Sequence, residues 1–173
     1  MKKRLIIFSI IGIIGISVIA LVISASRLQR LNKMREISIS PPAAQQLSNE
    51  ELLNYLNSGD TIVVNNTLTF IESKKDPFAV EKARVLLKSK DDYTWLCASM
   101  YLGACGNDES IPYLIKGLRH TAWRSDPRRV EYLQKITGQK FGTNFVQWKA
   151  WYEGSGGKAN FDWDSSLGAS PRL

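Results

Sequence analysis

The side chains that could carry out catalysis are few, and their spacing matches no known catalytic arrangement. His120 is the single histidine, so a site built from two histidines is excluded. Cys97 and Cys105 would lie about 12 Å apart along a helix, whereas a disulfide needs Cα atoms within about 7 Å of each other. The sequence has no Cys-x-x-Cys pair, glycine-rich phosphate loop or nucleophile elbow. We therefore expect no catalytic residues, no cofactor-binding residues and no metal site, and we do not expect an enzyme.

Basic residues gather between positions 119 and 129, where they could bind a partner. The candidates are Arg119, Arg124, Arg128 and Arg129, with Asp126 among them. Two interpretations remain open for this set. It is either a basic interaction patch or the ordinary charged surface of a solvated loop between helices, and the loop is the interpretation we favour.

A second candidate is the short segment Asn160-Phe-Asp-Trp-Asp164, which lies in a stretch rich in glycine and serine. Phe161 and Trp163 are large rings for such surroundings. The segment either folds back over the preceding helices or serves as a docking motif for a partner. We favour folding back, because the rings could shield apolar surface and the acidic residues could approach Arg124, Arg128 and Arg129.

These candidates follow a series of predicted helices. Ser48-Asn-Glu-Glu51 has the pattern of a capping box, so a folded domain is expected to begin there. Asp76-Pro77 and Asp126-Pro127 each supply a capping side chain followed by proline at the first helical position. Apolar spacing predicts helices at 49–57, 61–72, 77–89, 92–103, 109–119, 126–137 and 143–153.

The stretch Trp95 to His120 has the pattern of two helices joined by a glycine turn. Gly103 and Gly106 can adopt the positive φ that ends a helix, and Pro112 suits the first turn of the next. Leu-Gly-x-x-Gly followed by Ile-Pro-x-Leu-Ile-x-x-Leu resembles the HEAT-like repeat of the phycobilin-lyase type. The resemblance implies an all-α fold, a short right-handed α-solenoid of HEAT-like helical hairpins.

The end of the helical region carries a stripe of aromatic residues. Thr137-Gly-Gln-Lys-Phe-Gly142 followed by Phe145, Trp148, Trp151 and Tyr152 resembles the ending of bacterial HEAT-like repeat proteins. The rings either form a binding surface or close the open end of the stack. We favour closure, because a terminal repeat must cover its last apolar face.

The residues from 5 to 26 are uncharged and mostly Ile, Leu and Val, with basic residues on both sides. A helix of that length measures roughly 33 Å, enough to cross a hydrocarbon core of about 30 Å. We expect an uncleaved single-pass membrane anchor, with a cleaved signal peptide as the alternative. Basic residues flank both ends almost equally; we favour a bulk domain on the extracytoplasmic, periplasmic side.

The chain carries a net charge of +7, but the excess lies near this apolar segment. Residues 37–173 hold sixteen basic and fifteen acidic residues, so the remainder is almost neutral. Attraction to lipid headgroups explains the basic flanks better than binding to nucleic acid does, and we expect no nucleic-acid partner.

The expected organisation has five parts. They are a basic N-terminal tail at 1–4, a transmembrane helix at 5–26, a juxtamembrane linker at 27–47, a HEAT-like domain at 48–153 and a flexible tail at 154–173. The expected function is a membrane-tethered scaffold for protein–protein interaction, or an accessory subunit of a membrane complex, whose partner is another membrane-associated protein. A bilin lyase-like pigment-attachment factor is the alternative that the family name suggests.

Overall fold

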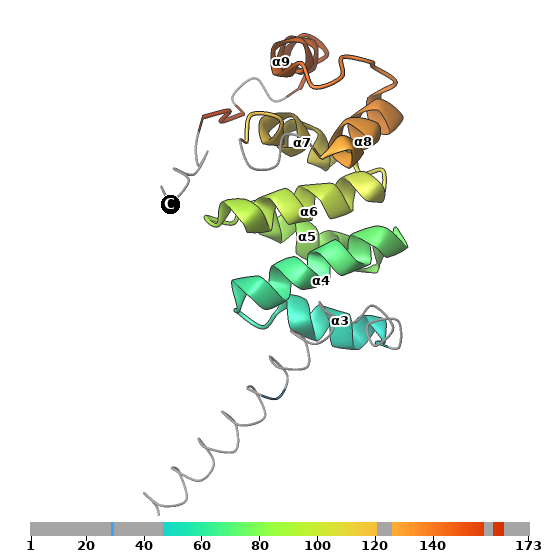
Figure 1. Ribbon diagram of the computed structural model, residues 1–173, viewed down its shortest axis with the longest axis vertical. Helices are drawn as coiled ribbons and strands as arrows, with labels where there is room; N and C mark the ends of the chain where they lie inside the picture. The colour runs from blue at the N-terminus through green and yellow to red at the C-terminus, as the bar shows by residue number, and fades with distance from the viewer. Residues whose placement is uncertain (1–28, 30–46, 121–125, 158–160, 165–173) are drawn as a thin grey trace, which may run out of the picture. The chain divides into compact units, whose positions relative to one another are not determined.

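The described part of the chain is helical and contains no strand. The computed structural model describes residues 29, 47–120, 126–157 and 161–164 (Figure 1). The chain divides into two units, 1–46 and 47–173. The second unit contains α3 (Asn49–Leu56), α4 (Thr61–Lys74), α5 (Val80–Leu86), α6 (Asp92–Ala104), α7 (Ile111–Gly117), α8 (Pro127–Thr137) and α9 (Phe145–Gly154), with short 3-10 turns η1 (Pro77–Ala79) and η2 (Asp108–Ser110). The all-α class expected from the sequence is confirmed for these residues.

The helix ends follow the capping chemistry that the sequence predicts. Ser48 and Glu51 form the reciprocal capping box at the start of α3. Asp126 accepts a hydrogen bond from the backbone of Arg128 at the start of α8. Gly138 ends α8 with a φ of 73°. Because each cap involves residues only a few positions apart, local sequence was sufficient to locate it.

Two predicted helices begin differently from expectation. The segment expected as one helix at 77–89 begins with the 3-10 turn η1 and continues as α5 only to Leu86. The helix expected at 109–119 likewise begins with η2 and ends at Gly117. In both cases an Asp or Asn side chain caps a tight first turn before the α-helix starts.

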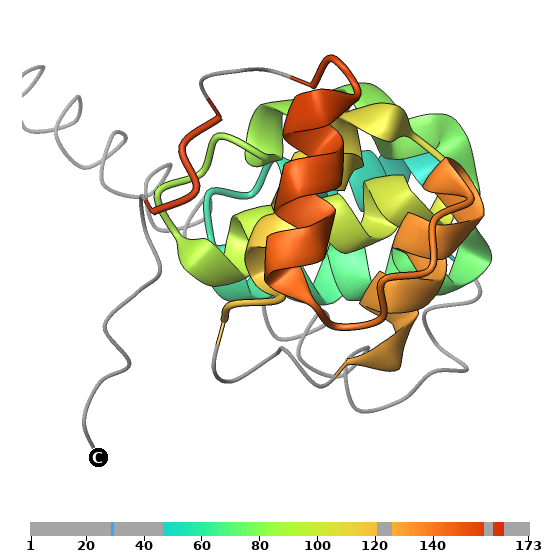
Figure 2. The same ribbon diagram turned by 90° about the horizontal axis from the view of Figure 1, so that it is seen from above.

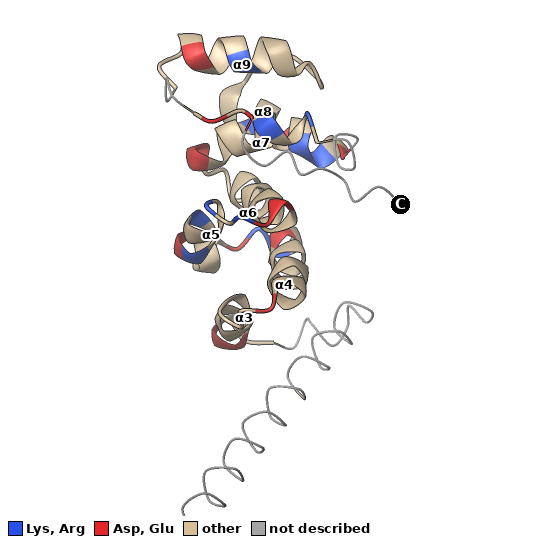
Figure 3. Cartoon of the chain, turned by 90° about the vertical axis from the view of Figure 1, so that its left-hand side faces the viewer, with Lys and Arg blue, Asp and Glu red and all other residues tan. Residues whose placement is uncertain are grey.

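The helices stack in succession along the domain (Figures 1 and 3). Helix α3 packs against α4, and α4 packs against α6. Helix α6 lies at the centre and also contacts α5, α7 and α8, while α7 reaches α9 at the far end. Every residue of α6 from Thr94 to Ala104 is buried, as expected for a helix with neighbours on all sides.

Gly103 lies inside α6 and does not end it, contrary to the sequence prediction. A Cβ atom on Gly103 would lie 3.0 Å from Leu114 Cδ1 and 3.2 Å from Tyr132 Cβ. The glycine therefore serves close packing of α6 against α7 and α8. Gly106, with a φ of 75°, is the residue that turns the chain.

The aromatic stripe on α9 closes one end of the helical core. Trp148 is fully buried, and its indole Nε1 donates a hydrogen bond of 2.8 Å to the carbonyl oxygen of Gly142. Phe141 packs edge-on against the Trp148 ring at 5.0 Å between centroids, and so fills the turn before α9. The prediction that the stripe covers the end of the helical core is confirmed for Trp148.

The expected transmembrane helix at 5–26 lies outside the described residues. Among the residues that are described, none of the helices combines the length and the apolar character that a membrane crossing requires.

Candidate functional site

Residues 161–164 return to the helical domain (Figure 2). Their side chains and backbone contact residues of α7 and α9. Trp163 is 7% exposed and belongs to the same apolar cluster as Trp148 and Leu133. The prediction that this segment folds back is therefore confirmed. We call the surface of α7 and α9 that holds residues 161–164 the tail site.

The Trp163 ring is held by other rings and by one polar contact. Phe145 and Tyr152 of α9 each meet it edge-on at 5.8 Å, and Phe161 does so at 4.7 Å. The indole Nε1 donates a hydrogen bond of 3.0 Å to Glu153. Perpendicular rings bring the positive edge of one ring to the negative face of another, and the polar end of the indole is also satisfied.

Two cations, Lys116 in α7 and Arg119 just after it, hold the backbone of the same segment. Lys116 Nζ donates a hydrogen bond of 3.1 Å to the carbonyl oxygen of Asp162. Arg119 donates one of 3.4 Å to the carbonyl oxygen of Trp163 and forms an ion pair with Asp164. The expected pairing of the acidic residues with Arg128 and Arg129 was wrong, because the segment lies against α7 and α9 rather than the start of α8.

Lys116 is unusual for a lysine because its side chain is almost completely buried, with 4% of its surface exposed. Its ammonium group lies 5.5 Å from the ring centroid of Trp95 and 5.9 Å from that of Phe161. Burial lowers the pKa of Lys116, while the nearby Asp162 raises it in part. The lysine thus contributes a cation within an aromatic setting, where its charge attracts both rings and carbonyl oxygens.

A groove adjoins the tail site on the side of α5. Its volume is about 550 Å³, and Phe161, Tyr113 and Tyr152 form the wall that it shares with the tail site. Val85 projects beside it with 64% of its surface exposed. The remaining lining residues are Glu81, Arg84, Leu87, Lys88, Asp108, Glu109 and Pro112. A groove that combines aromatic walls with a charged rim resembles the make-up of peptide-binding surfaces.

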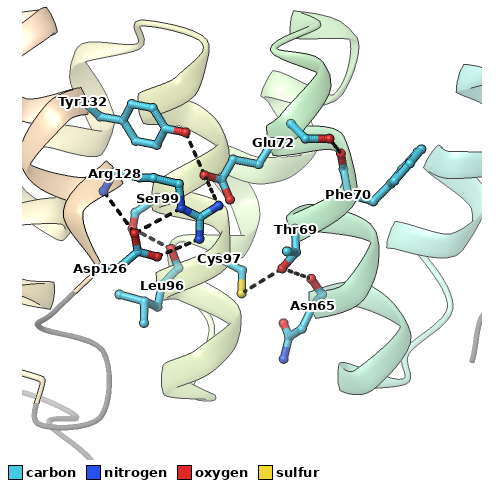
Figure 4. Close-up of polar contacts among 11 residues, drawn as sticks. Asn65, Thr69, Phe70, Glu72, Leu96, Cys97, Ser99, Asp126, Arg128 and Tyr132 are labelled. Atoms are coloured by element: carbon cyan, nitrogen blue, oxygen red, sulfur yellow. Dashed lines mark hydrogen bonds and ion pairs between the residues drawn. The ribbon is translucent and has the colours of Figure 1, made fainter. Parts of the chain in front are cut away.

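Arg128 lies away from the tail site, in a polar network between α4 and α8 (Figure 4). It pairs with Glu72 at 3.0 Å and with Asp126 at 2.7 Å. The Tyr132 hydroxyl donates to the same Glu72 oxygen at 2.8 Å. The interactions of Arg128 within the domain are sufficient to explain its position.

Arg129 is 1% exposed and lies on α8 rather than on a solvated loop, so the loop interpretation was wrong for this residue. Its guanidinium donates a hydrogen bond of 2.8 Å to the carbonyl oxygen of Gly117 at the end of α7. Burial lowers its pKa, and the nearby Asp126 raises it in part. Arg124 lies outside the described residues.

The two carboxyl groups of this network have pKa values shifted in opposite directions, that of Glu72 by burial and that of Asp126 by hydrogen bonds. Burial raises the pKa of Glu72 above its ordinary value, and the contacts with Tyr132 and Arg128 offset that effect only in part. The hydrogen bonds from Arg128 lower the pKa of Asp126. In this network, therefore, Glu72 loses its proton less readily than an ordinary glutamate, and Asp126 loses its proton more readily than an ordinary aspartate.

The two cysteines are free, and the buried one is shielded from reaction. Cys97 is 7% exposed, and its sulfur lies 3.9 Å from the Thr69 hydroxyl. Burial raises the pKa of Cys97 to about 11, so the thiol stays protonated at neutral pH. In the described ranges, no three His, Cys, Asp or Glu side chains gather in a way that could hold a metal ion.

Comparison of the chain with protein-family models, curated proteins and solved structures finds no match. The sequence pattern identified Arg119, Phe161 and Trp163 of the tail site, but it did not reveal Lys116 and Tyr113. Lys116 comes directly after the apolar residues Leu114 and Ile115 of α7. A lysine so close to an apolar face was the one feature of the sequence that indicated a buried cation.

Proposed function

We propose that this chain is a membrane-tethered domain of HEAT-like helical hairpins that binds another protein, as a scaffold or as an accessory subunit of a membrane complex. One observation carries the proposal: the α7–α9 surface already holds a non-helical peptide segment, residues 161–164. Lys116 and Arg119 bind its carbonyl oxygens, and aromatic side chains enclose its tryptophan. Such contacts are those by which proteins recognise peptides.

The stacking of the helices supports the solenoid part of this proposal. Helix pairs α3/α4, α5/α6 and α7/α8 pack in order, and α6 contacts both α4 and α8. Stacked helical pairs present long surfaces that suit protein partners. Because a fold by itself does not specify a function, the proposed binding role depends on the tail site and the groove beside it.

The membrane tether rests on the apolar residues 5–26 and their basic flanks. We place the helical domain on the extracytoplasmic side. A tether confines the domain to one membrane surface, which raises the local concentration of membrane-bound partners.

Crosslinking from the groove in intact membranes tests the binding role. A benzophenone amino acid replaces Val85, which lines the groove and is 64% exposed. The matched control carries it at Val146 of α9, which is 71% exposed and does not line the groove. We expect a discrete crosslinked protein from position 85 and none from position 146. Equal products from both positions, or none from position 85, would contradict a partner at the groove.

A further inference from the structure

The tail site combines two recognition chemistries that reach different parts of a bound segment. Lys116 and Arg119 contact carbonyl oxygens, which every peptide possesses. The rings of Phe145 and Tyr152 contact the tryptophan side chain, which few segments possess. The first set holds the backbone of the segment, and the second distinguishes a segment with a tryptophan from one without it.

The charges around the site favour an acidic segment. Lys149 lies 6.0 Å from the centroid of the Trp163 ring, and Arg119 lies 5.1 Å from that of Phe145. Together with Lys116, they place three cations around the bound chain, whereas Glu153 accepts the hydrogen bond of the indole N–H. The residues on either side of the tryptophan are both aspartates. The site and its occupant are therefore complementary in charge as well as in shape.

The contacts of the segment are unequal in strength. Asp164 and its partner Arg119 are exposed, with 82% and 36% of their side-chain surfaces accessible, and such a pair contributes about 0–1 kcal/mol. Trp163 is almost fully buried among rings, the environment in which single tryptophans dominate binding. One side chain therefore accounts for most of the attachment, so a second segment with the same side chain is able to compete for the site.

We propose that the tail site is a receptor for a partner segment of the form aromatic-acidic-tryptophan-acidic, and that residues 161–164 are its built-in competitor. This inference rests on the proposed function and specifies the partner's chemistry. A tail on the same chain acts at an effective concentration of order millimolar. A partner segment must therefore bind more tightly than the tail does, or be present at a comparable local concentration, to displace it. While the tail occupies the site in most molecules, the apparent affinity for a partner is reduced in proportion to the fraction of sites that are free. Release of the tail removes this reduction.

The test measures binding of a fluorescein-labelled peptide with the sequence of residues 158–166 to the full-length chain in detergent. Wild type is compared with two variants that release the tail, Trp163→Ala and Asp164→Arg. The second changes an exposed side chain and places a cation against Arg119, so it does not put the fold at risk. We expect Trp163→Ala to bind the peptide at least about tenfold more tightly than wild type does. Asp164→Arg alters only the exposed ion pair, so we expect it to bind the peptide more tightly by at most about fivefold.

Three controls give the test its specificity. A peptide with alanine in place of tryptophan should bind at least about tenfold more weakly. Arg119→Glu on the Trp163→Ala background should also weaken binding, whereas Lys140→Glu, at an exposed position outside the site, should not. Circular dichroism checks that each variant retains its helices.

Three results would overturn the inference: equal peptide affinity in wild type and both released variants, equal binding of the alanine peptide, or concentration-dependent dimers that exchange tails. If one of these occurs while the Val85 crosslink still forms, a partner binds at the groove by another chemistry, and the proposed function survives. If the peptide binds as expected and no crosslink forms, the peptide receptor stands without a partner at the groove.

Discussion

The Tyr132 hydroxyl on α8 donates a hydrogen bond of 2.8 Å to the carboxylate of Glu72 on α4, across a separation of 60 residues. Arg128 donates to the same oxygen. The three side chains connect two helices that both pack against α6 (Figure 4). Glu72 is 3% exposed, so the loss of a donor leaves a buried carboxylate with fewer partners.

Tyr132→Phe tests this relationship directly. The ring keeps its packing while the donor is lost, so we expect a decrease of about 1–3 kcal/mol in the free energy of unfolding. Urea denaturation of the full-length chain in detergent measures it. Tyr113→Phe on α7, a half-buried tyrosine outside this network, serves as the control. A loss of stability as large in the control would show that the effect belongs to tyrosine hydroxyls in general.

The raised pKa of Glu72 predicts a pH dependence with a definite sign. A carboxyl group with a higher pKa in the folded state binds more protons when folded, so its contribution to stability falls as pH rises above its ordinary value of 4.5. Glutamine cannot ionise. The stability of Glu72→Gln relative to wild type should therefore increase with pH from about 4.5 upward until the folded carboxyl group is fully ionised.

Denaturation of both proteins at several pH values between about 4 and 7 measures that difference, on the order of 1.4 kcal/mol for each unit of pKa shift. Glu131→Gln, at an exposed position of α8, provides the control. A difference between Glu72→Gln and wild type that falls with pH would mean that Tyr132 and Arg128 stabilise the carboxylate more than burial penalises it.

Gly103→Ala should destabilise the domain even though alanine favours helices. The new methyl group would lie 3.0 Å from Leu114 Cδ1 and 3.2 Å from Tyr132 Cβ, so these closely packed side chains must give way by a few tenths of an ångström. We expect a net cost of about 1–3 kcal/mol. Gly154→Ala at the end of α9 meets nothing within 4 Å and should be neutral or slightly stabilising. Thermal unfolding followed by circular dichroism compares the two variants.

Trp163→Ala should lower the melting temperature by only a few degrees. Although the ring is buried, the segment that carries it can detach, so the cost is limited to the free energy of tail docking. Leu133 lies in the centre of the core on α8 and cannot detach in this way, so Leu133→Ala should lower the free energy of unfolding by about 2–5 kcal/mol. If Trp163→Ala unfolds the domain as severely as Leu133→Ala does, the tail is an essential part of the core.

The apolar segment at 5–26 predicts the behaviour of the chain in fractionation. The full-length protein should remain in the membrane pellet after an alkaline wash, at a mass that includes residue 1. A soluble chain that begins near residue 27 would instead identify a cleaved signal peptide. Protease access to a tag after residue 173 in intact cells reports the orientation, and protection of the tag would contradict the outward placement.

The sequence by itself determined where most helices begin and end. Ser48, Asp126 and Gly138 act on backbone groups within a few residues, so their effects are visible in the local pattern. It also indicated that residues 161–164 fold back, because large rings in a polar stretch need a place to be buried. These inferences depend on short-range chemistry or on composition, both of which a linear sequence displays.

Tertiary structure decided which residues meet. Glycine is common in turns, yet Gly103 lies within α6, at a point where α7 and α8 approach the helix closely. Arg119, rather than Arg128 or Arg129, pairs with Asp164 because the α7–α9 surface lies beside the tail. Arg128 instead meets Glu72, 56 residues earlier. A charge has many possible partners in a sequence, and only the packing of the helices brings one of them within a few ångströms.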